Sequence, residues 1–320
     1  MIRSVFKGCG SYLPERIVTN HELAERVETS HSWIVKRTGI EQRHVAAEDE
    51  TTLDMAEAAA RQALDHASMK ADEIDTIIIA TTTPDKTFPS TAVQLQGRLG
   101  IAHGYGFDVQ AVCSGFVYAL SVADSLIKAG RSKNTLVIGA EKMSAILDWN
   151  DRSTCILFGD GAGAVILSAE EGEGERGIVS CHLHSNGAHK DLLYTSGGTA
   201  TTGESGVIHM EGQEVFKHAV TYLSDIVDET LEANNLKPAD IDWLVPHQAN
   251  IRIIEGTAKK LDMSMERVVT TIHKHGNTSA ASIPLALNEA VRDGRIKPGE
   301  LILFEALGGG FTWGSALMRL

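Results

Sequence analysis

The sequence predicts an α/β fold built from two similar halves, and two observations support this prediction. Apolar runs of the kind that form buried strands alternate with stretches of helical period, as is typical of α/β proteins. In addition, segments of the first half recur in the second half in the same order. With 320 residues, of which 43% are hydrophobic, the chain can bury a large core without disulfides or metals.

Each expected element has its own pattern. The strand-type runs are short and rich in Ile, Leu and Val, and they lie at 75–83, 134–141, 163–169, 242–248 and 300–306. The helical stretches place apolar residues three or four positions apart, at 52–67, 114–130, 214–235 and 283–294. This alternation favours sheets that are covered by helices.

The internal repeat consists of two matches. The Ile-Asp pair at 74–75 recurs at 241–242, each time after a long helix and before a strand. The Gly-Arg pair at 130–131 recurs at 294–295, at nearly the same offset. Two matches in register are harder to attribute to chance than one, so they indicate two related halves.

The boundary between the halves is expected in the segment 170–177. This segment is acidic, contains glycine and has no apolar periodicity. We therefore expect one half at 1–172 and the other at 173–320. Loops at the ends of matching strands can then form an active site between the halves.

Charge and cysteine content narrow the class of protein. The formal net charge of −13 argues against general nucleic-acid binding, because a phosphate backbone would be repelled. No apolar run approaches the roughly 20 residues of a membrane span, and the N-terminal residues do not resemble a signal peptide. The four cysteines lack zinc-ligand spacing. We therefore expect no metal, no membrane contact and a cytoplasmic location.

Cys113 is the candidate nucleophile. It follows a strand-type segment at 107–112 and precedes a helical stretch, so its thiol is expected at a helix N-terminus. The helix dipole and free N–H groups favour the thiolate there. The alternative is a buried structural cysteine. That interpretation is preferred for Cys9, Cys155 and Cys181, which are expected within strand-like runs.

His247 and Asn277 occupy comparable positions in the second half. His247 follows a strand-type run, and Asn277 precedes a helical stretch. Both side chains can donate a hydrogen bond to one carbonyl oxygen, and such a pair can stabilise an enolate. Taken alone, a histidine after a strand is more often structural, and an asparagine before a helix is more often a cap.

Two glycine clusters are candidate ligand sites. The cluster at 159–164 has neither nucleotide-binding spacing nor a following helix, which favours a tight turn. The glycines at 308–310 follow a strand and leave backbone N–H groups accessible, which suits an oxyanion site. A flexible turn is the simpler alternative for them.

Together these residues match a known family. The chain resembles β-ketoacyl-acyl carrier protein synthase III over essentially its whole length. The matching segments are GIEQRH at 39–44, VCSGF at 112–116, FGDGAGA at 158–164, WLVPHQAN at 243–250, HGNTSAAS at 275–282 and GGGFTWGSA at 308–316.

The resemblance implies a thiolase-like five-layer αβαβα fold with two pseudo-symmetric halves, a homodimer and no cofactor. It implies that Cys113 takes an acyl group from acyl-CoA. His247 and Asn277 then bind the malonyl thioester of malonyl-acyl carrier protein while carbon dioxide leaves, and the carbanion attacks the acyl-Cys. Backbone N–H groups of Cys113 and Gly310 would hold the oxyanion. The resemblance implies that the 3-oxoacyl-acyl carrier protein formed in this way initiates fatty-acid synthesis.

The resemblance also implies three further groups of residues. The CoA site falls on Trp33, Arg37, Thr38, Arg152, Gly212, Phe216, Ala219 and Asn250. The primer pocket falls on Phe88, Met143 and Leu307, of which the bulky Phe88 implies a short primer such as acetyl-CoA. The carrier-protein site falls on Lys217, Arg252, Lys259 and Lys260. The last three of these share one helical face, whose positive charge suits an acidic partner.

Several alternatives remain open from the sequence. A related condensing enzyme could use a longer acyl-CoA in a specialised pathway. A degradative thiolase would need a second cysteine as a base. A Cys-His-Asn hydrolase would release free acid, and a non-catalytic scaffold would leave three reactive residue types unexplained. The Gly/Thr-rich segment 195–209 is interpreted either as a mobile flap at the entrance or as an exposed loop.

Overall fold

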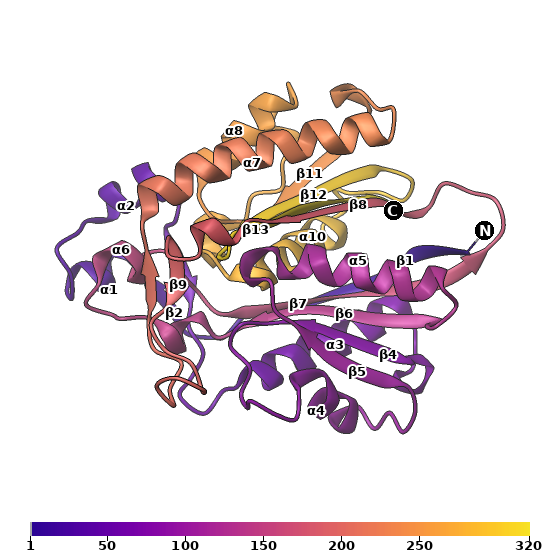
Figure 1. Ribbon diagram of the computed structural model, residues 1–320, viewed down its shortest axis with the longest axis horizontal. Coiled ribbons are helices and arrows are strands. Elements are labelled where there is room, and N and C mark those ends of the chain that lie inside the picture. Colours follow the sequence, from indigo (N-terminus) through magenta and orange to yellow (C-terminus); the bar gives the residue numbers. More distant parts are fainter. Residues whose placement is uncertain (1) are drawn as a thin grey trace.

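The protein folds into five layers in a computed structural model that describes residues 2–320. Two sheets alternate with three layers of helices, as Figure 1 shows, with α7 and α8 at the top and α3 and α4 at the bottom. The outer helices are α3 (Thr52–Ala67), α4 (Thr91–Arg98), α7 (Gly212–Ala233) and α8 (Ile251–Lys260). The expected αβαβα architecture is therefore confirmed.

The first sheet has the order β1-β7-β6-β4-β5. Its strands are β1 (Ile2–Tyr12), β4 (Thr76–Ala80), β5 (Tyr105–Val109), β6 (Asn134–Glu141) and β7 (Gly161–Glu171). Strand β4 runs parallel to β5 and β6, whereas β7 is antiparallel to β1 and β6. The buried apolar runs fit such a sheet, because helices cover both of its faces.

The second sheet has the order β11-β12-β13-β8. Its strands are β8 (Gly177–Ser185), β11 (Trp243–Pro246), β12 (Leu301–Gly308) and β13 (Thr312–Arg319). Each sheet draws its strands from one side of the expected boundary. The division into units at 1–172 and 173–320 itself stays a prediction.

Two helices fill the space between the sheets. These are α5 (Gly115–Lys128) and α10 (Ser282–Arg292), and both contact strands of both sheets. Phe116 of α5 and Ile283 of α10 are at most 1% exposed and belong to one core cluster with Phe304 of β12. Because α5 and α10 begin just after Cys113 and Asn277, this packing fixes the positions of both candidate residues.

Shorter elements surround these layers. On one side lie α1 (Asn20–Ala24), α2 (His31–Thr38), α6 (Arg152–Cys155) and α9 (Ile272–His275), with the strand pairs β2–β3 (Ile17–Thr19, Gln42–His44) and β9–β10 (Leu193–Thr195, Ile208–Met210). Cys155 therefore lies in a helix, so the expectation of a strand there is wrong. The other two structural candidates, Cys9 and Cys181, lie in β1 and β8 as expected.

The sequence repeat has a structural counterpart. Asp75, just before β4, accepts a hydrogen bond of 2.8 Å from the backbone N–H of Lys133, beside the start of β6. Asp242, just before β11, accepts one of 2.9 Å from the N–H of Leu301, at the start of β12. In each half an aspartate thus fixes the start of the neighbouring parallel strand.

Candidate active site

Cys113 lies in a 3-10 turn, η2 (Val112–Ser114), directly before α5. The expectation that an extended strand runs to Val112 is wrong, because β5 ends at Val109 and Val112 has a φ of 48°. A positive φ is unfavourable for a β-branched residue, so the surrounding contacts must hold this turn. The chain thereby turns Cys113 to the N-terminal end of α5.

The Cys113 thiol is buried at 4% exposure. Burial raises its pKa to about 12, and the negative charge of Glu141 acts in the same direction, whereas hydrogen bonding to Ser279 and its own backbone opposes the rise. The thiol is therefore neutral at pH 7 in the free protein. The helix dipole at the start of α5 acts in favour of the thiolate.

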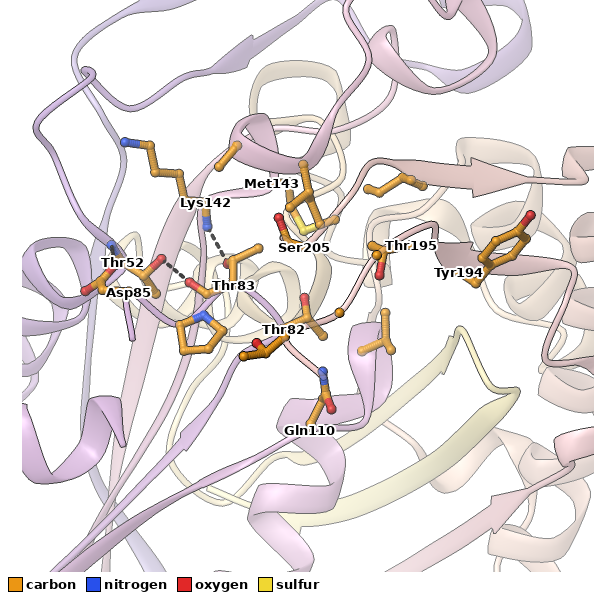
Figure 2. A pocket seen from close by; sticks show the side chains of 18 of the residues that line it. Thr52, Thr82, Thr83, Asp85, Gln110, Lys142, Met143, Tyr194, Thr195 and Ser205 are labelled. Carbon is orange, nitrogen blue, oxygen red and sulfur yellow. Dashed lines mark hydrogen bonds between the residues drawn. The ribbon is translucent and has the colours of Figure 1, made fainter. Parts of the chain in front are cut away.

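A cavity of about 710 Å³ adjoins Cys113. Figure 2 shows Thr82, Thr83, Met143, Thr195 and Ser205 gathered around it, from several separate segments of the chain. Because Thr195 and Ser205 belong to the segment 195–209, this segment forms part of the cavity wall. The sequence allowed this segment to be either a mobile flap or an exposed loop. In the structure, part of it lines the cavity.

His247 follows β11, and its position is fixed from two sides. Its backbone N–H donates a hydrogen bond of 2.8 Å to the carbonyl of Glu305 in β12. Its ring Nδ1 lies 2.6 Å from Oγ of Ser282 at the start of α10. Burial lowers the pKa of His247 to about 3, so the imidazole is neutral and suited to hydrogen bonding rather than to charge stabilisation.

Asn277 directly precedes the turn formed by η7 (Ser279–Ala281). Its Oδ1 accepts a hydrogen bond of 2.9 Å from the backbone N–H of Ser279, which leaves the amide NH₂ as the donor of this side chain. Its backbone pairs with Phe158, which lines the cavity. Asn277 is therefore a buried, oriented amide.

The segment 277–282 brings the three candidates together. Its turn η7 packs against η2, the turn that contains Cys113. Ser282, at the other end of the segment, holds the ring of His247. Cys113 lines the cavity, whereas His247 and Asn277 are at most 6% exposed and lie outside its described lining.

The glycines at 308–310 close over the Cys113 turn. A Cβ atom at Gly308 would lie 2.6 Å from the backbone nitrogen of Cys113, so only glycine fits there. Gly310 has a φ of 135°. Just beyond, Thr312 Oγ1 donates a hydrogen bond of 2.9 Å to the carbonyl of Ala111. The glycine turn is thus fixed against the candidate nucleophile.

The expected CoA residues lie on α2, α6, α7 and at the start of α8. Two guanidinium groups lie near the Trp33 ring, with Cζ of Arg37 at 4.5 Å and Cζ of Arg152 at 5.1 Å from its centroid. Asn250 joins α8 to α2, because its Nδ2 donates a hydrogen bond of 3.0 Å to the carbonyl of Arg37. These four of the expected CoA residues therefore lie close together in the structure.

The remaining CoA candidates differ in exposure, from the exposed Gly212 to the buried Ala219 and Thr38. Gly212 begins α7, and Phe216 lies one turn further along it, 5.1 Å below Cζ of Arg252. Ala219 is 2% exposed. The hydroxyl of Thr38, also buried, donates to the carbonyl of Ile34 at 2.8 Å and accepts from Ile40 at 3.0 Å. The CoA contacts of these residues stay predictions.

The expected carrier-protein residues lie on two helices that contact each other, α7 and α8. Arg252 and Lys259 are exposed on α8. Lys260 forms an ion pair of 2.6 Å with Asp228 of α7, and Lys217 lies 3.9 Å from Glu214. The two lysines with acidic neighbours are therefore partly neutralised, so Arg252 and Lys259 contribute most of the free positive charge.

The three expected primer-pocket residues lie in three different places in the structure. Met143 lines the cavity beside Cys113. Phe88 is 83% exposed, at the outer side of the loop whose residues 82–87 line the cavity. Leu307 is buried in a separate apolar cluster with Phe311 and Ile253. Their roles toward a primer stay predictions.

Sequence reasoning missed two residues beside the nucleophile, Glu141 and Ser279. Glu141 ends the strand β6, is 0% exposed and accepts a hydrogen bond of 3.0 Å from Oγ of Ser279. A glutamate at the end of a buried apolar run is itself a signal, because such a carboxylate needs partners. The sequence offered no comparable signal for Ser279.

Residues 2–320 contain no group of three or more His, Cys, Asp or Glu side chains arranged to hold a metal ion. None of the helices in this part of the chain combines the length and apolar character that crossing a bilayer requires.

Comparison with known proteins gives a consistent result. Residues 107–187 match the model of the 3-oxoacyl-[acyl-carrier-protein] synthase III family, and residues 231–320 match the model of its C-terminal part. The β-ketoacyl-[acyl-carrier-protein] synthase III of Rhodospirillum centenum is 64% identical over 320 residues, which cover 99% of each chain. That of Paramagnetospirillum magneticum is 62% identical over 323 residues, which cover both chains completely.

Solved structures agree with the curated relatives. The 3-oxoacyl-[acyl-carrier-protein] synthase III of Aquifex aeolicus superimposes with a TM-score of 0.94 at 47% identity, covering 99% of this chain and 100% of that one. The priming β-ketosynthase of the R1128 polyketide pathway gives a TM-score of 0.93 at 34% identity, with coverages of 99% and 96%. The expected acyltransferase is confirmed, and this chain belongs to the β-ketoacyl-[acyl-carrier-protein] synthase III family.

Proposed function

We propose that this enzyme joins a short acyl-CoA, with acetyl-CoA as the preferred primer, to malonyl-acyl carrier protein and so starts fatty-acid synthesis. Cys113 attacks the acyl-CoA carbonyl and keeps the acyl group as a thioester, while CoA leaves. Malonyl-acyl carrier protein then enters and loses carbon dioxide. The resulting carbanion attacks the acyl-Cys, which releases the 3-oxoacyl product and frees Cys113.

His247 and Asn277 stabilise the enolate formed by decarboxylation. A neutral imidazole and an amide NH₂ both donate hydrogen bonds, and the burial of each side chain strengthens such bonds. Decarboxylation removes no proton, so neither group has to act as a base. The N–H groups of Cys113 and Gly310 hold the oxyanion of the tetrahedral intermediate.

The observation that carries this proposal is the arrangement of segment 277–282. Its turn η7 packs against the turn η2 that holds Cys113, its Ser282 lies 2.6 Å from the His247 ring, and it contains Asn277 itself. One nucleophile and two neutral donors therefore converge from both halves. A simple hydrolase would need an ionisable base beside the thiol, and a His247 with a pKa of about 3 is poorly suited to that role.

The proposal extends to binding partners and assembly. CoA is held along α2 and α6, with its adenine on Trp33 and its phosphates near Arg37. The carrier protein docks on Arg252 and Lys259, aided by Lys217 and Lys260. Two copies pair along the exposed edge of the first sheet, which is formed by β5. The enzyme works in the cytoplasm without a cofactor, and its four free cysteines suit a reducing compartment.

Intact-protein mass spectrometry tests the reaction directly. Purified enzyme is mixed with acetyl-CoA, and then with malonyl-acyl carrier protein. We expect an acetyl adduct on the wild type and none on Cys113→Ser, followed by discharge of the adduct as a 3-oxoacyl product. Release of free acetate without malonyl-acyl carrier protein would instead indicate a hydrolase.

A second candidate concerns the primer alone. The cavity of about 710 Å³ beside Cys113 exceeds what an acetyl group needs, and the R1128 relative is a priming ketosynthase of a polyketide pathway. The cavity volume favours a longer acyl-CoA, and the relative shows that chains with this fold also act in other pathways. Hexanoyl-CoA and octanoyl-CoA in the same mass assay decide between the two primers, because adducts with only the longer chains would reject acetyl-CoA.

A further inference from the structure

Gln248 is a completely buried amide, at 0% exposure, whose side chain is bonded only to backbone groups. Its Nε2 donates hydrogen bonds to the carbonyls of Pro246 at 2.8 Å and Val269 at 3.1 Å. Its Oε1 accepts from the N–H groups of Thr271 at 2.8 Å and Ile272 at 3.1 Å. An amide has two hydrogens and two lone pairs, so these four bonds use its full capacity and fix its orientation.

These four bonds join the end of a strand to the start of a helix. Pro246 is the last residue of β11, and Ile272 is the first residue of α9. The first N–H groups of a helix need acceptors from outside it, and the N-cap residue Thr271 provides no side-chain bond. Gln248 therefore caps α9 and binds it to the end of β11.

The two joined segments carry the two proposed enolate donors. His247 directly precedes Gln248, and Asn277 follows α9 after a single intervening residue, Gly276. The N–H of Gly276 donates to the carbonyl of Ile272 at 3.0 Å, so one closed helical turn leads from the Gln248 contact to Asn277. A short, fully bonded path thus connects the two donors.

Other contacts hold the donors from different sides. The backbone of Asn277 is bonded to segment 157–159, which orients it without reaching His247. Ser282 holds the His247 ring from the segment that follows Asn277. Gln248 acts from the segment that precedes Asn277, and it binds the backbone rather than the ring. The spacing of the two donors therefore depends on Gln248 as well as on Ser282.

We propose that Gln248 is a positioning residue that sets the separation between His247 and Asn277, and so controls the rate at which malonyl-acyl carrier protein is decarboxylated. The inference rests on the proposed roles of these two donors. Gln248 touches no substrate, because its side chain is buried and all its hydrogen-bonding capacity is used by the backbone. It acts only through the residues that it holds.

Two substitutions test this role. Gln248→Glu keeps the size of the side chain and its acceptors, but its ionised form has no hydrogen for Pro246 or Val269. Gln248→Asn keeps the amide, but the side chain is one methylene too short to reach both segments. Both changes are small, and the second variant guards against a failure of the first to fold.

Single-turnover kinetics separate the two half-reactions. Each enzyme is acetylated with acetyl-CoA, freed of excess acetyl-CoA and mixed with malonyl-acyl carrier protein, and discharge of the adduct is followed by rapid quench and intact mass. We expect the maximal discharge rate of both variants to fall by about 100-fold, the effect of misplacing a reacting group by about 1 Å. The half-saturating concentration of malonyl-acyl carrier protein and the rate of acetylation should stay at their wild-type values. Because only acetylated enzyme is counted, partial unfolding cannot imitate this result.

Asn288→Asp is the matched control, because it also changes a buried amide to a carboxyl group. Asn288 is 9% exposed on α10, and its Nδ2 donates a hydrogen bond of 2.7 Å to Oγ of Ser11 in β1. This bond does not join the two donors, so we expect wild-type rates in both half-reactions. A slow discharge in this variant as well would show a general sensitivity to buried carboxyl groups and would overturn the inference.

Three results from the Gln248 variants would also overturn it. Discharge at the wild-type rate would reduce Gln248 to a helix cap. Equal slowing of acetylation and discharge would indicate general damage to the site. A raised half-saturating concentration at an unchanged maximal rate would place the effect in carrier-protein docking.

His247→Ala and Asn277→Ala distinguish failure of the inference from failure of the proposed function. If these two variants lose discharge while the Gln248 variants keep it, the proposed donors stand and only the role of Gln248 is rejected. If both discharge the adduct at the wild-type rate, the proposed donors are rejected and the inference falls with them.

Discussion

Nδ1 of His247 lies 2.6 Å from Oγ of Ser282, and the same Oγ accepts a hydrogen bond of 3.3 Å from the backbone N–H of Gln248. The hydroxyl of Ser282 can donate its hydrogen to Nδ1 while it accepts from Gln248. We propose this arrangement, which places the hydrogen of the neutral imidazole on Nε2. This is the tautomer that can donate to an enolate oxygen.

Ser282→Ala tests that assignment. Without the hydroxyl the imidazole loses its preferred tautomer, so we expect decarboxylation of malonyl-acyl carrier protein to slow by about 10- to 100-fold, the usual effect of removing a residue that orients a functional histidine. Acylation of Cys113 by acetyl-CoA is the internal control and should keep its rate. An equal loss in both half-reactions would point to general damage of the site.

Glu305 predicts a pH dependence of stability. Burial raises its pKa to about 8, whereas an unfolded chain releases this proton near pH 4.3, about the reference value for glutamate. Between these values the folded state holds a proton that the unfolded state has lost, so the contribution of Glu305 to stability declines as the pH rises above about 4.3 and is lost once the pH has passed through about 8.

Glu305→Gln removes this dependence. Urea denaturation at pH 5 and pH 8.5 should show the free energy of unfolding of the wild type falling relative to the variant as the pH increases. His247 and the other titrating groups are common to both proteins and cancel in the difference. A difference that stays constant between the two pH values would contradict the raised pKa.

Trp33 and Trp149 provide a matched pair for the CoA site. Each has a guanidinium over its ring, Arg152 at 5.1 Å and Arg26 at 5.9 Å, but Trp149 lines a separate cavity of about 300 Å³. Trp33→Ala should raise KM for acetyl-CoA by about tenfold through the loss of stacking on the adenine. Trp149→Ala should leave KM close to wild type. Equal effects would remove Trp33 from the CoA site.

The basic face of α8 predicts graded effects on carrier-protein use. Lys259→Glu should lower kcat/KM for malonyl-acyl carrier protein by about tenfold at low salt, with less effect at high salt, since exposed charges are screened. Lys260→Glu should have a smaller effect, because Asp228 already pairs with this lysine at 2.6 Å. Acylation by acetyl-CoA should be unchanged in both. The reverse order of the two variants would place the docking site elsewhere.

Most of the fold could be predicted from the hydrophobic periodicity of the sequence. The helix at 52–67 and the strand at 134–141 have the bounds that their patterns predict, because both are continuous and strongly apolar on the buried side. The strand at 75–83 ends early, at Ala80. Thr81, Thr82 and Thr83 have strand propensity, but their hydroxyls turn to Glu141 instead, which is a long-range effect that a local pattern does not contain.

Only part of the site could be predicted from the sequence, because long-range contacts determine the rest. Cys113, His247 and Asn277 lie at the ends of helices or strands, where the hydrophobic periodicity changes. This change allowed all three to be predicted as candidate site residues. Glu141 was counted only as the last residue of a strand, because its partners lie about 60 and 138 residues away. The wall formed by segment 195–209 depends on packing across the molecule, so composition alone left its role undecided.

The burial of Cys113 has a consequence for oxidative damage. Peroxides attack thiolates, and the free enzyme holds very little thiolate at a pKa of about 12. A sulfenic acid should therefore form on Cys113 slowly in the resting enzyme. The side chain that must react with every primer is thus shielded from a common cellular oxidant until a thioester arrives.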